Sequence, residues 1–239
     1  MYIWPNNARA AISLTYDDGM ASQIENAIPI LKKYNLKATF FPTGDYLNYD
    51  KHGKEWQGVI KDGNEIGCHT INHPCDIAKK LKYNLQDYSL QKMKDELKQN
   101  IGLINKLGYK KDYYVFAYPC GDTFVGSNDQ SYIPLAKEMF LAARSVTWRQ
   151  AQPDAIDMWQ IPCFAVDGKT GPEMIKLAKE AEAANSWAVF LFHGVGGDWI
   201  PTDPKGHEEL LEYLSVNRDK YCIAPFGEVA EYIKQKRGK

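Results

Sequence analysis

Short apolar runs alternate with amphipathic stretches along the chain. Runs at 10–16, 37–43 and 65–68 have the length of buried strands. The segments between them, at 21–34 and 55–61, carry apolar residues at helical spacing. This order predicts strands that are joined by helices over the first third of the chain.

The same alternation continues to the end of the sequence. A helical stretch at 85–107 closes at Gly108, and a strand predicted at 113–118 stops at Pro119. The later predicted elements are strands at 140–143, 160–166, 187–192 and 221–224, and helices at 172–184, 207–217 and 227–235. Repeated strand-helix units favour a parallel sheet, and about eight of them can close a barrel. We therefore predict an α/β fold, a distorted (β/α) barrel with seven or eight parallel strands; an open doubly wound sheet is the alternative.

The composition is that of a globular protein with one domain. Of 239 residues, 44% are hydrophobic and 25% charged, and no repeat or linker divides them, so we expect a single domain over residues 1–239. The formal net charge of −1 gives no basic surface for a nucleic-acid partner, and no apolar run approaches the roughly 20 residues of a membrane helix. Aromatic residues make up 13%, which suits sugar binding as well as core packing.

The cysteines and the opening segment bear on the compartment. The five cysteines are Cys68, Cys75, Cys120, Cys163 and Cys222. An odd set without a Cys-x-x-Cys pair argues against a disulfide framework and favours a reducing compartment. Residues 1–5 lack the basic and apolar segments of a secretory signal, so we expect a cytoplasmic protein, with a trimmed secreted form as the alternative.

Polar residues that are suited to catalysis follow three of the predicted strands. Asp17 and Asp18 follow the first strand, His69 and His73 the third, and His193 a late one. In a parallel barrel these positions meet at the carboxyl ends of the strands, where such folds carry their chemistry. Paired aspartates before a glycine are also common in simple turns, which is the alternative explanation of the first motif.

Two imidazoles and a carboxylate are suitable ligands for a divalent metal ion. His69 and His73 can bind one ion, and an aspartate completes a set that leaves positions open for water and substrate, as catalytic sites do. A second carboxylate would then accept a proton, and a late histidine would supply the acid. Cys68 and Cys75 raise the alternative of a structural zinc site, although Cys68 is expected to point away from His69 in a strand.

Four ordered motifs resemble those of polysaccharide deacetylases of carbohydrate esterase family four, which share the nodulation-type deacetylase homology domain. Thr15-Tyr-Asp-Asp-Gly19 is similar to the first family motif, His69-x-x-x-His73 to the second, Tyr118-Pro-Cys-Gly121 to the third and Leu191-x-His193 to the fifth. The resemblance covers nearly the whole chain. It implies that metal-activated water removes N-acetyl or O-acetyl groups from an acetylated oligo- or polysaccharide.

The resemblance also implies a role for each residue. Asp17 would be the general base and His193 the general acid, while Asp18, His69 and His73 would bind one divalent ion, zinc first and cobalt, nickel or manganese as alternatives. The implied oxyanion and substrate contacts are Tyr118, Pro119, Cys120, Gly121 and Trp159, with the backbone N–H of Cys120 at the oxyanion. Trp199 is a further candidate substrate contact, which comes from the segment after His193 and not from a family motif. Cys120 as a nucleophile is the rival interpretation.

Two positions depart from the family pattern. Ala117 stands where many members have an arginine that positions the base, so Arg144 or Arg149 is the candidate replacement. The fourth motif is not clean, because Asp154 and Asp157 both precede Trp159, and Trp148 is another candidate for the acetyl pocket. The missing third-motif arginine keeps a carbohydrate-binding pseudoenzyme as an alternative. A hydrolase of a non-sugar amide is a separate alternative, since the sequence does not identify the substrate.

Two further features lie near the late histidine. A glycine-rich segment at 194–198 precedes Trp199 and is either a mobile lip beside the acid or only a connector. His207 opens a predicted helix and is expected at the surface or behind the ligands, rather than as a fourth ligand.

Overall fold

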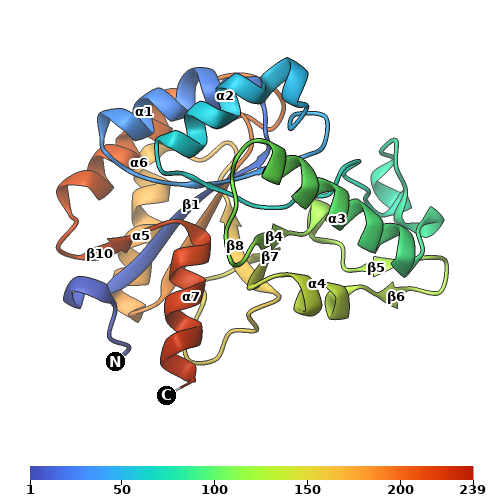
Figure 1. Cartoon of the computed structure of the whole chain (residues 1–239). Helices are drawn as coiled ribbons and strands as arrows, with labels where there is room; N and C mark the ends of the chain where they lie inside the picture. The colour runs from blue at the N-terminus through green and yellow to red at the C-terminus, as the bar shows by residue number, and fades with distance from the viewer. Residues whose placement is uncertain (239) are drawn as a thin grey trace.

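A computed structural model describes residues 1–238 and shows strands surrounded by helices (Figure 1). The strands are β1 (Ala10–Asp18), β2 (Thr39–Pro42), β3 (Glu65–Ile66), β4 (Val115–Ala117), β5 (Phe124–Val125), β6 (Gln130–Ser131), β7 (Ala142–Trp148), β8 (Ile161–Ala165), β9 (Trp187–Phe192) and β10 (Tyr221–Ile223). The α-helices are α1 (Ile28–Lys33), α2 (Tyr49–Lys61), α3 (Leu90–Lys106), α4 (Ile133–Met139), α5 (Gly171–Ala184), α6 (Pro204–Val216) and α7 (Phe226–Arg237).

Seven parallel strands form a nearly closed barrel. Their order along the sheet is β3-β2-β1-β9-β8-β7-β4. Among these seven strands, those that are neighbours in the sheet are also consecutive in the chain, with β9 returning to β1. The two ends of this path meet at Cys68, whose N–H donates to the carbonyl of Val115 (2.8 Å) and whose carbonyl accepts from Ala117 (3.0 Å). β10 adds an eighth parallel strand beside the start of β1. The predicted distorted (β/α) barrel is confirmed.

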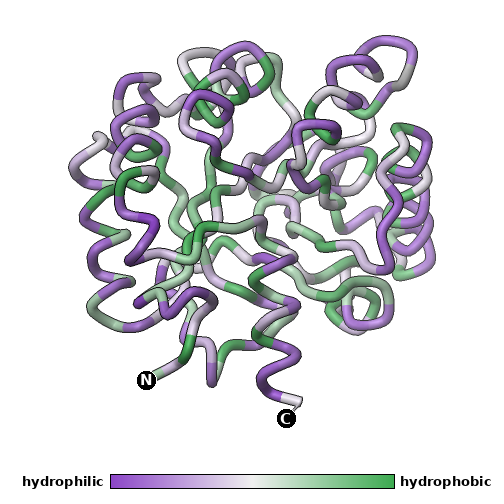
Figure 2. Tube along the Cα trace, turned by 60° about the vertical axis from the view of Figure 1, so that its left-hand side comes forward, coloured by the Kyte–Doolittle hydropathy of each residue, from purple (hydrophilic) through white to green (hydrophobic). Residues whose placement is uncertain are grey.

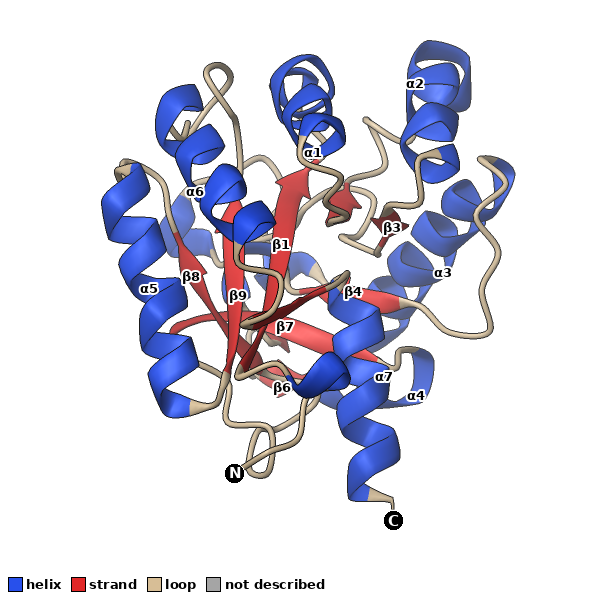
Figure 3. Cartoon of the chain, turned by 90° about the vertical axis from the view of Figure 1, so that its left-hand side faces the viewer, coloured by secondary structure: helices blue, strands red, loops and turns tan. Residues whose placement is uncertain are grey.

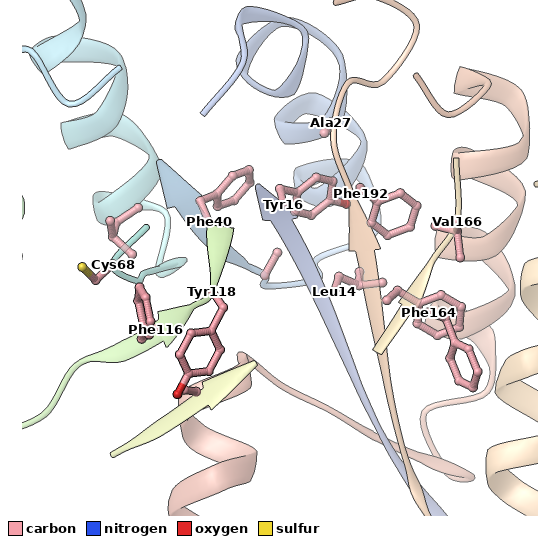
Figure 4. Close-up of a cluster of buried hydrophobic side chains, with 14 of the residues drawn as sticks. Leu14, Tyr16, Ala27, Phe40, Cys68, Phe116, Tyr118, Phe164, Val166 and Phe192 are labelled. Atoms are coloured by element: carbon pink, nitrogen blue, oxygen red, sulfur yellow. The ribbon is translucent and has the colours of Figure 1, made fainter. Parts of the chain in front are cut away.

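Alternate residues of β1 belong to two separate cores. Ile12, Leu14 and Tyr16 pack outward in the layer between sheet and helices, where Figure 4 shows Leu14 and Tyr16 among other buried side chains. Ala11 belongs to the barrel interior, and α7 contributes Phe226 to the same cluster. All nine residues of β1 are therefore buried, which explains its continuous apolar run.

Hydrophobic residues gather in the interior of the fold, and hydrophilic residues are frequent on its outer turns (Figure 2). Within residues 1–238, none of the helices has the length and apolar composition required to cross a membrane. Both chain ends lie away from the arrowhead of β1 (Figure 3). The carboxyl ends of the strands are thus free to carry loops with functional side chains.

A buried carboxyl group lies at the opposite, amino-terminal side of the sheet. Glu65 begins β3, and its Oε2 accepts hydrogen bonds from Thr39 Oγ1 (2.6 Å) and from the N–H of Gly227 (2.8 Å). Burial raises the pKa of Glu65 to about 7, although the two hydrogen bonds act in the other direction. The folded protein therefore keeps a proton on Glu65 at pH values where the unfolded chain has lost it.

This proton predicts a pH dependence of stability. Between the ordinary glutamate pKa of 4.5 and about 7, the folded state binds more protons than the unfolded state, so the Glu65 contribution to the free energy of unfolding falls as pH rises. The expected fall is roughly 3 kcal/mol. Glu65→Gln should flatten this part of the curve of Tm against pH, whereas the exposed Glu212→Gln should leave it unchanged. Parallel curves for wild type and Glu65→Gln would contradict the assignment.

Candidate active site

Loops at the carboxyl ends of the strands border one cavity of about 560 Å³. Asp17 and Asp18 reach it from the end of β1, and His193 follows β9 directly. The loop after β3 contributes His73, and the turn after β4 contributes Cys120. Four segments that are distant in the sequence thus meet at the same end of the barrel, as predicted.

Asp18, His69 and His73 bring three potential metal-ligand atoms close together. Asp18 Oδ1 lies 3.4 Å from His69 Nε2 and 3.3 Å from His73 Nε2, and the three ligand atoms lie within 4.8 Å of one another. Within residues 1–238, this buried Oδ1 has no hydrogen-bond partner. A carboxylate oxygen that is buried between two imidazole nitrogens fits a divalent cation.

The orientation of His69 suits the same ion. Its Nδ1 donates to the carbonyl of Ala117 (2.8 Å), which fixes the proton on that nitrogen in the neutral ring and leaves Nε2 available as a ligand. Asp18 and His73 both have positive φ values, 73° and 49°. Their side chains therefore depend on unusual backbone turns for their direction.

The charges of the site favour a bound cation. Burial opposes ionisation of Asp18, but the nearby imidazoles, His69 first, outweigh burial and lower its pKa. Burial acts to lower the pKa of His69, but the carboxylates of Asp17 and Asp18 outweigh burial, so this pKa is raised above the ordinary histidine value. Burial and the neighbouring His69 lower the pKa of His73 to about 4, so this ring is neutral near pH 7. A divalent ion would compete with the proton on His69 for the same carboxylates.

A buried arginine forms an ion pair with Asp17, the other aspartate of the first motif. Arg144 is fully buried, and its Nη2 contacts both carboxylate oxygens of Asp17, with 2.5 Å to Oδ1. Its strand β7 pairs with β4 so that Arg144 lies opposite Ala117. Arg149, the other candidate, is exposed beyond the end of β7. The guanidinium therefore reaches Asp17 from the strand next to Ala117, not from the position of Ala117 itself.

The comparisons with known proteins bear directly on this arrangement. Residues 5–139, more than half of the chain, match the family model described as polysaccharide deacetylase. The chain belongs to the polysaccharide deacetylase family. This confirms the resemblance to polysaccharide deacetylases of carbohydrate esterase family four that the motifs indicated.

The relatives reported next share little sequence identity with this deacetylase-family chain. The uncharacterized protein YlxY of Bacillus subtilis is 30% identical over 216 residues, which cover 90% of this chain and 54% of YlxY. The chain thus spans about half the length of that relative. The solved structure of a putative polysaccharide deacetylase from Mycobacterium smegmatis has a TM-score of 0.67 at 15% identity, covering 98% of this chain and 93% of the other.

A second solved structure shares the fold. The Xyl-CE4 domain of a multidomain xylanase, from the hindgut metagenome of Trinervitermes trinervoides, has a TM-score of 0.59 at 19% identity, covering 96% of this chain and 91% of that domain. At such identities these two likenesses show the fold alone. The deacetylase fold therefore extends beyond the residues that the family model matches.

The other candidate substrate contacts lie at different distances from the cavity. Tyr118 is buried and packs edge-on against Phe116 in the outer core (Figure 4). Trp159 donates its indole N–H to the carbonyl of Phe140 (3.2 Å) and does not border the cavity. By contrast, Trp199 borders the cavity and donates its indole N–H to Asp18 Oδ2 (3.1 Å).

The third-motif turn lies between these groups. Pro119 is buried, and Cys120 and Gly121 have positive φ values of 55° and 76°. At Gly121 a Cβ atom would lie only 2.3 Å from Val146, so the close approach of the two segments requires glycine. The tight turn brings Cys120 to the cavity wall while Gly121 faces β7.

One expectation about the cysteines is wrong. Cys75 and Cys120 form a disulfide that joins the loop of His73 to the third-motif turn. Cys75 is paired and lies two residues from His73, so it is not free for a structural Cys/His zinc site. Cys68, Cys163 and Cys222 are free thiols. A pairing across 45 residues has no local signal, because it depends on two loops meeting at the cavity.

His207 and Trp148 lie outside the cavity. His207 is fully buried rather than at the surface, and its Nε2 lies 2.7 Å from Tyr16 OH. Burial lowers its pKa to about 3, so the ring is a neutral core group. Trp148 is half exposed at the end of β7 and packs against Phe164. Neither residue contacts the candidate ligands.

Several cavity residues carry no sequence signal. Leu81 and Ile200, from two separate loops, and Val146 of β7 are exposed apolar residues that line the cavity. Gln23 supports the floor, since its Nε2 donates to the carbonyls of Asp17 (2.5 Å) and His193 (3.0 Å). Single exposed apolar residues are common, so only the tertiary arrangement identifies Leu81, Val146 and Ile200 as cavity residues.

Proposed function

We propose that the protein is a metal-dependent hydrolase that removes acetyl groups from a carbohydrate. The observation that carries the proposal is the unpartnered Oδ1 of Asp18 between two imidazole nitrogens, beside a second carboxylate that an arginine fixes. This arrangement provides a cation site and a separate proton acceptor within one cavity. His193 borders the same cavity and is available as an acid.

Each side chain has a distinct task in this proposal. A divalent ion held by Asp18, His69 and His73 would supply Lewis-acid chemistry and lower the pKa of water. Asp17 accepts a proton from the attacking water, and Arg144 keeps its carboxylate in place. The new bond joins the water oxygen to the acetyl carbon.

The remaining steps complete the hydrolysis. His193 donates a proton to the sugar oxygen or nitrogen as its bond to the acetyl carbon breaks, so the products are acetate and the deacetylated sugar. The backbone N–H of Cys120 would donate to the developing oxyanion from the cavity wall. Neither step requires a covalent bond to the protein.

The cavity walls support a sugar as the acetylated partner. Trp199 and Tyr46 offer aromatic faces, and Asp45, Asn72 and Lys79 offer polar groups for hydroxyls. The related Xyl-CE4 domain belongs to a xylanase, and another relative is described as a peptidoglycan-N-acetylglucosamine deacetylase. Amide and ester substrates share the same carbonyl chemistry, so acetylated xylan and N-acetylglucosamine polymers are both proposed substrates.

Metal removal tests the proposal. Chelation should abolish acetate release from acetylated xylo-oligosaccharides or from N-acetylglucosamine oligomers, and zinc or cobalt should restore it. The circular dichroism spectrum should not change, because two large hydrophobic clusters stabilise the fold without the ion. A structural zinc site predicts unfolding instead. Metal binding without acetate release from either substrate would favour a carbohydrate-binding pseudoenzyme.

A further inference from the structure

The two oxygens of Asp18 have different surroundings. Oδ1 faces the two histidine Nε2 atoms, whereas Oδ2 accepts the indole N–H of Trp199 at 3.1 Å. An indole N–H is a donor only, so it can bind the carboxylate but cannot compete for a cation. The hydrogen bond fixes the plane of the carboxylate and leaves Oδ1 as the oxygen that is directed at the ligand group.

The loop that carries Trp199 is tied to the segment after Asp18. The N–H of Ser22 donates to Asp198 Oδ2 (2.9 Å), and Ser22 Oγ accepts from the N–H of Val195 (3.1 Å). Asn26 Nδ2 donates to the carbonyl of Val195 (2.6 Å). These bonds come from residues 22–26, and β1 ends shortly before them at Asp18, so the indole and Asp18 are held in one local unit.

Glycines make this loop compact enough for the contact. A Cβ atom at Gly194 would lie 1.9 Å from the carbonyl oxygen of Gly197, and Gly196 has a φ of 72°. Both positions therefore require glycine. The glycine-rich segment folds back on itself and brings Trp199 over Asp18, which a simple connector would not need to do.

We propose that Trp199 is a positioning residue for the metal ligand Asp18, in addition to lining the cavity. Its hydrogen bond holds Oδ1 between His69 and His73 and thereby sets the affinity for the ion. The inference rests on the proposed function, since it assumes that these three residues bind a metal. Partners of this kind typically change metal affinity by about 10- to 100-fold.

Two matched substitutions test the inference. Trp199→Phe keeps a large aromatic ring but loses the N–H, and Trp148→Phe makes the same change at a residue with the same 50% exposure that lies outside the cavity. The dissociation constants for Zn²⁺ and Co²⁺ are measured by competition with a chelator. We expect Trp199→Phe to weaken binding by about 10- to 100-fold and Trp148→Phe to have no effect. Equal dissociation constants for Trp199→Phe and wild type would overturn the inference.

The kinetics separate positioning from substrate contact. At saturating metal, Trp199→Phe should recover most of the wild-type kcat if its main defect is metal affinity. A raised KM at saturating metal with an unchanged metal dissociation constant would assign Trp199 to substrate binding only and overturn the inference. Wild-type protein that binds no metal would instead contradict the proposed function. Wild-type protein that binds metal and releases acetate while Trp199→Phe binds metal equally well would contradict the inference alone.

Discussion

Asp17→Asn should lower kcat for acetate release by roughly 10²- to 10⁴-fold while the metal stays bound. Asparagine cannot accept the proton of the attacking water, but its carbonyl oxygen still accepts a hydrogen bond from Arg144. The three candidate ligands are unchanged. Metal content and kcat are measured on the same preparation, and circular dichroism confirms the folded state, because loss of the carboxylate also lowers Tm.

A control substitution tests whether the fall in kcat comes only from the loss of one negative charge. Asp167→Asn removes one negative charge from an exposed position after β8 and should leave kcat unchanged. If Asp17→Asn kept wild-type kcat with metal bound, Asp17 would not be the base and the proposed mechanism would be wrong. If the variant instead lost the metal, Asp17 would belong with the ligands.

Arg144→Met should lower the free energy of unfolding by about 3–5 kcal/mol. Arg144 is 0% and Asp17 only 3% exposed, so the substitution leaves a carboxylate buried without its counter-charge. Urea denaturation measures the change. Arg149→Met is the control, since Arg149 is exposed after the same strand and should alter stability by no more than about 0.5 kcal/mol.

A double variant tests whether the stability effect belongs to the pair. Asp17→Asn combined with Arg144→Met removes both charges, so the total loss should be smaller than the sum of the two single losses. Additive losses would mean that the two side chains are not energetically coupled. Equal stabilities for Arg144→Met and Arg149→Met would likewise contradict the buried ion pair.

The sequence was sufficient for the barrel and for the order of the motifs. Buried parallel strands are apolar on both faces, and for this reason the runs around β1 and β9 were clear. β7 was predicted too short, at 140–143, because the polar residues Arg144 and Ser145 interrupt its apolar run, while the strand continues to Trp148. α2 begins at Tyr49, ahead of the predicted 55–61, because the Asn48 side chain accepts from the N–H of Asp50.

The choice between the two arginines lay beyond sequence reasoning. Both follow Ala117 by a similar distance along the chain, and only the register of β4 and β7 places Arg144 opposite Ala117. The hairpin of β5 and β6 and the helix α4 were also missed, since each is short and has no clear period. Features that depend on pairing between distant segments need the tertiary structure.

The pairing of β1 with β9 has a consequence for biosynthesis. Thr15 and Phe190, which are joined by a hydrogen bond, are separated by 175 residues. At about 5–20 residues per second, a ribosome needs roughly 10–35 s to make the intervening chain. During that time one edge of β1 has no partner, and Asp17 lacks His193, the proposed acid. The nascent protein therefore passes through a period in which an apolar strand edge is open to aggregation. The residues of the candidate active site come together only after the barrel's last strands have left the ribosome.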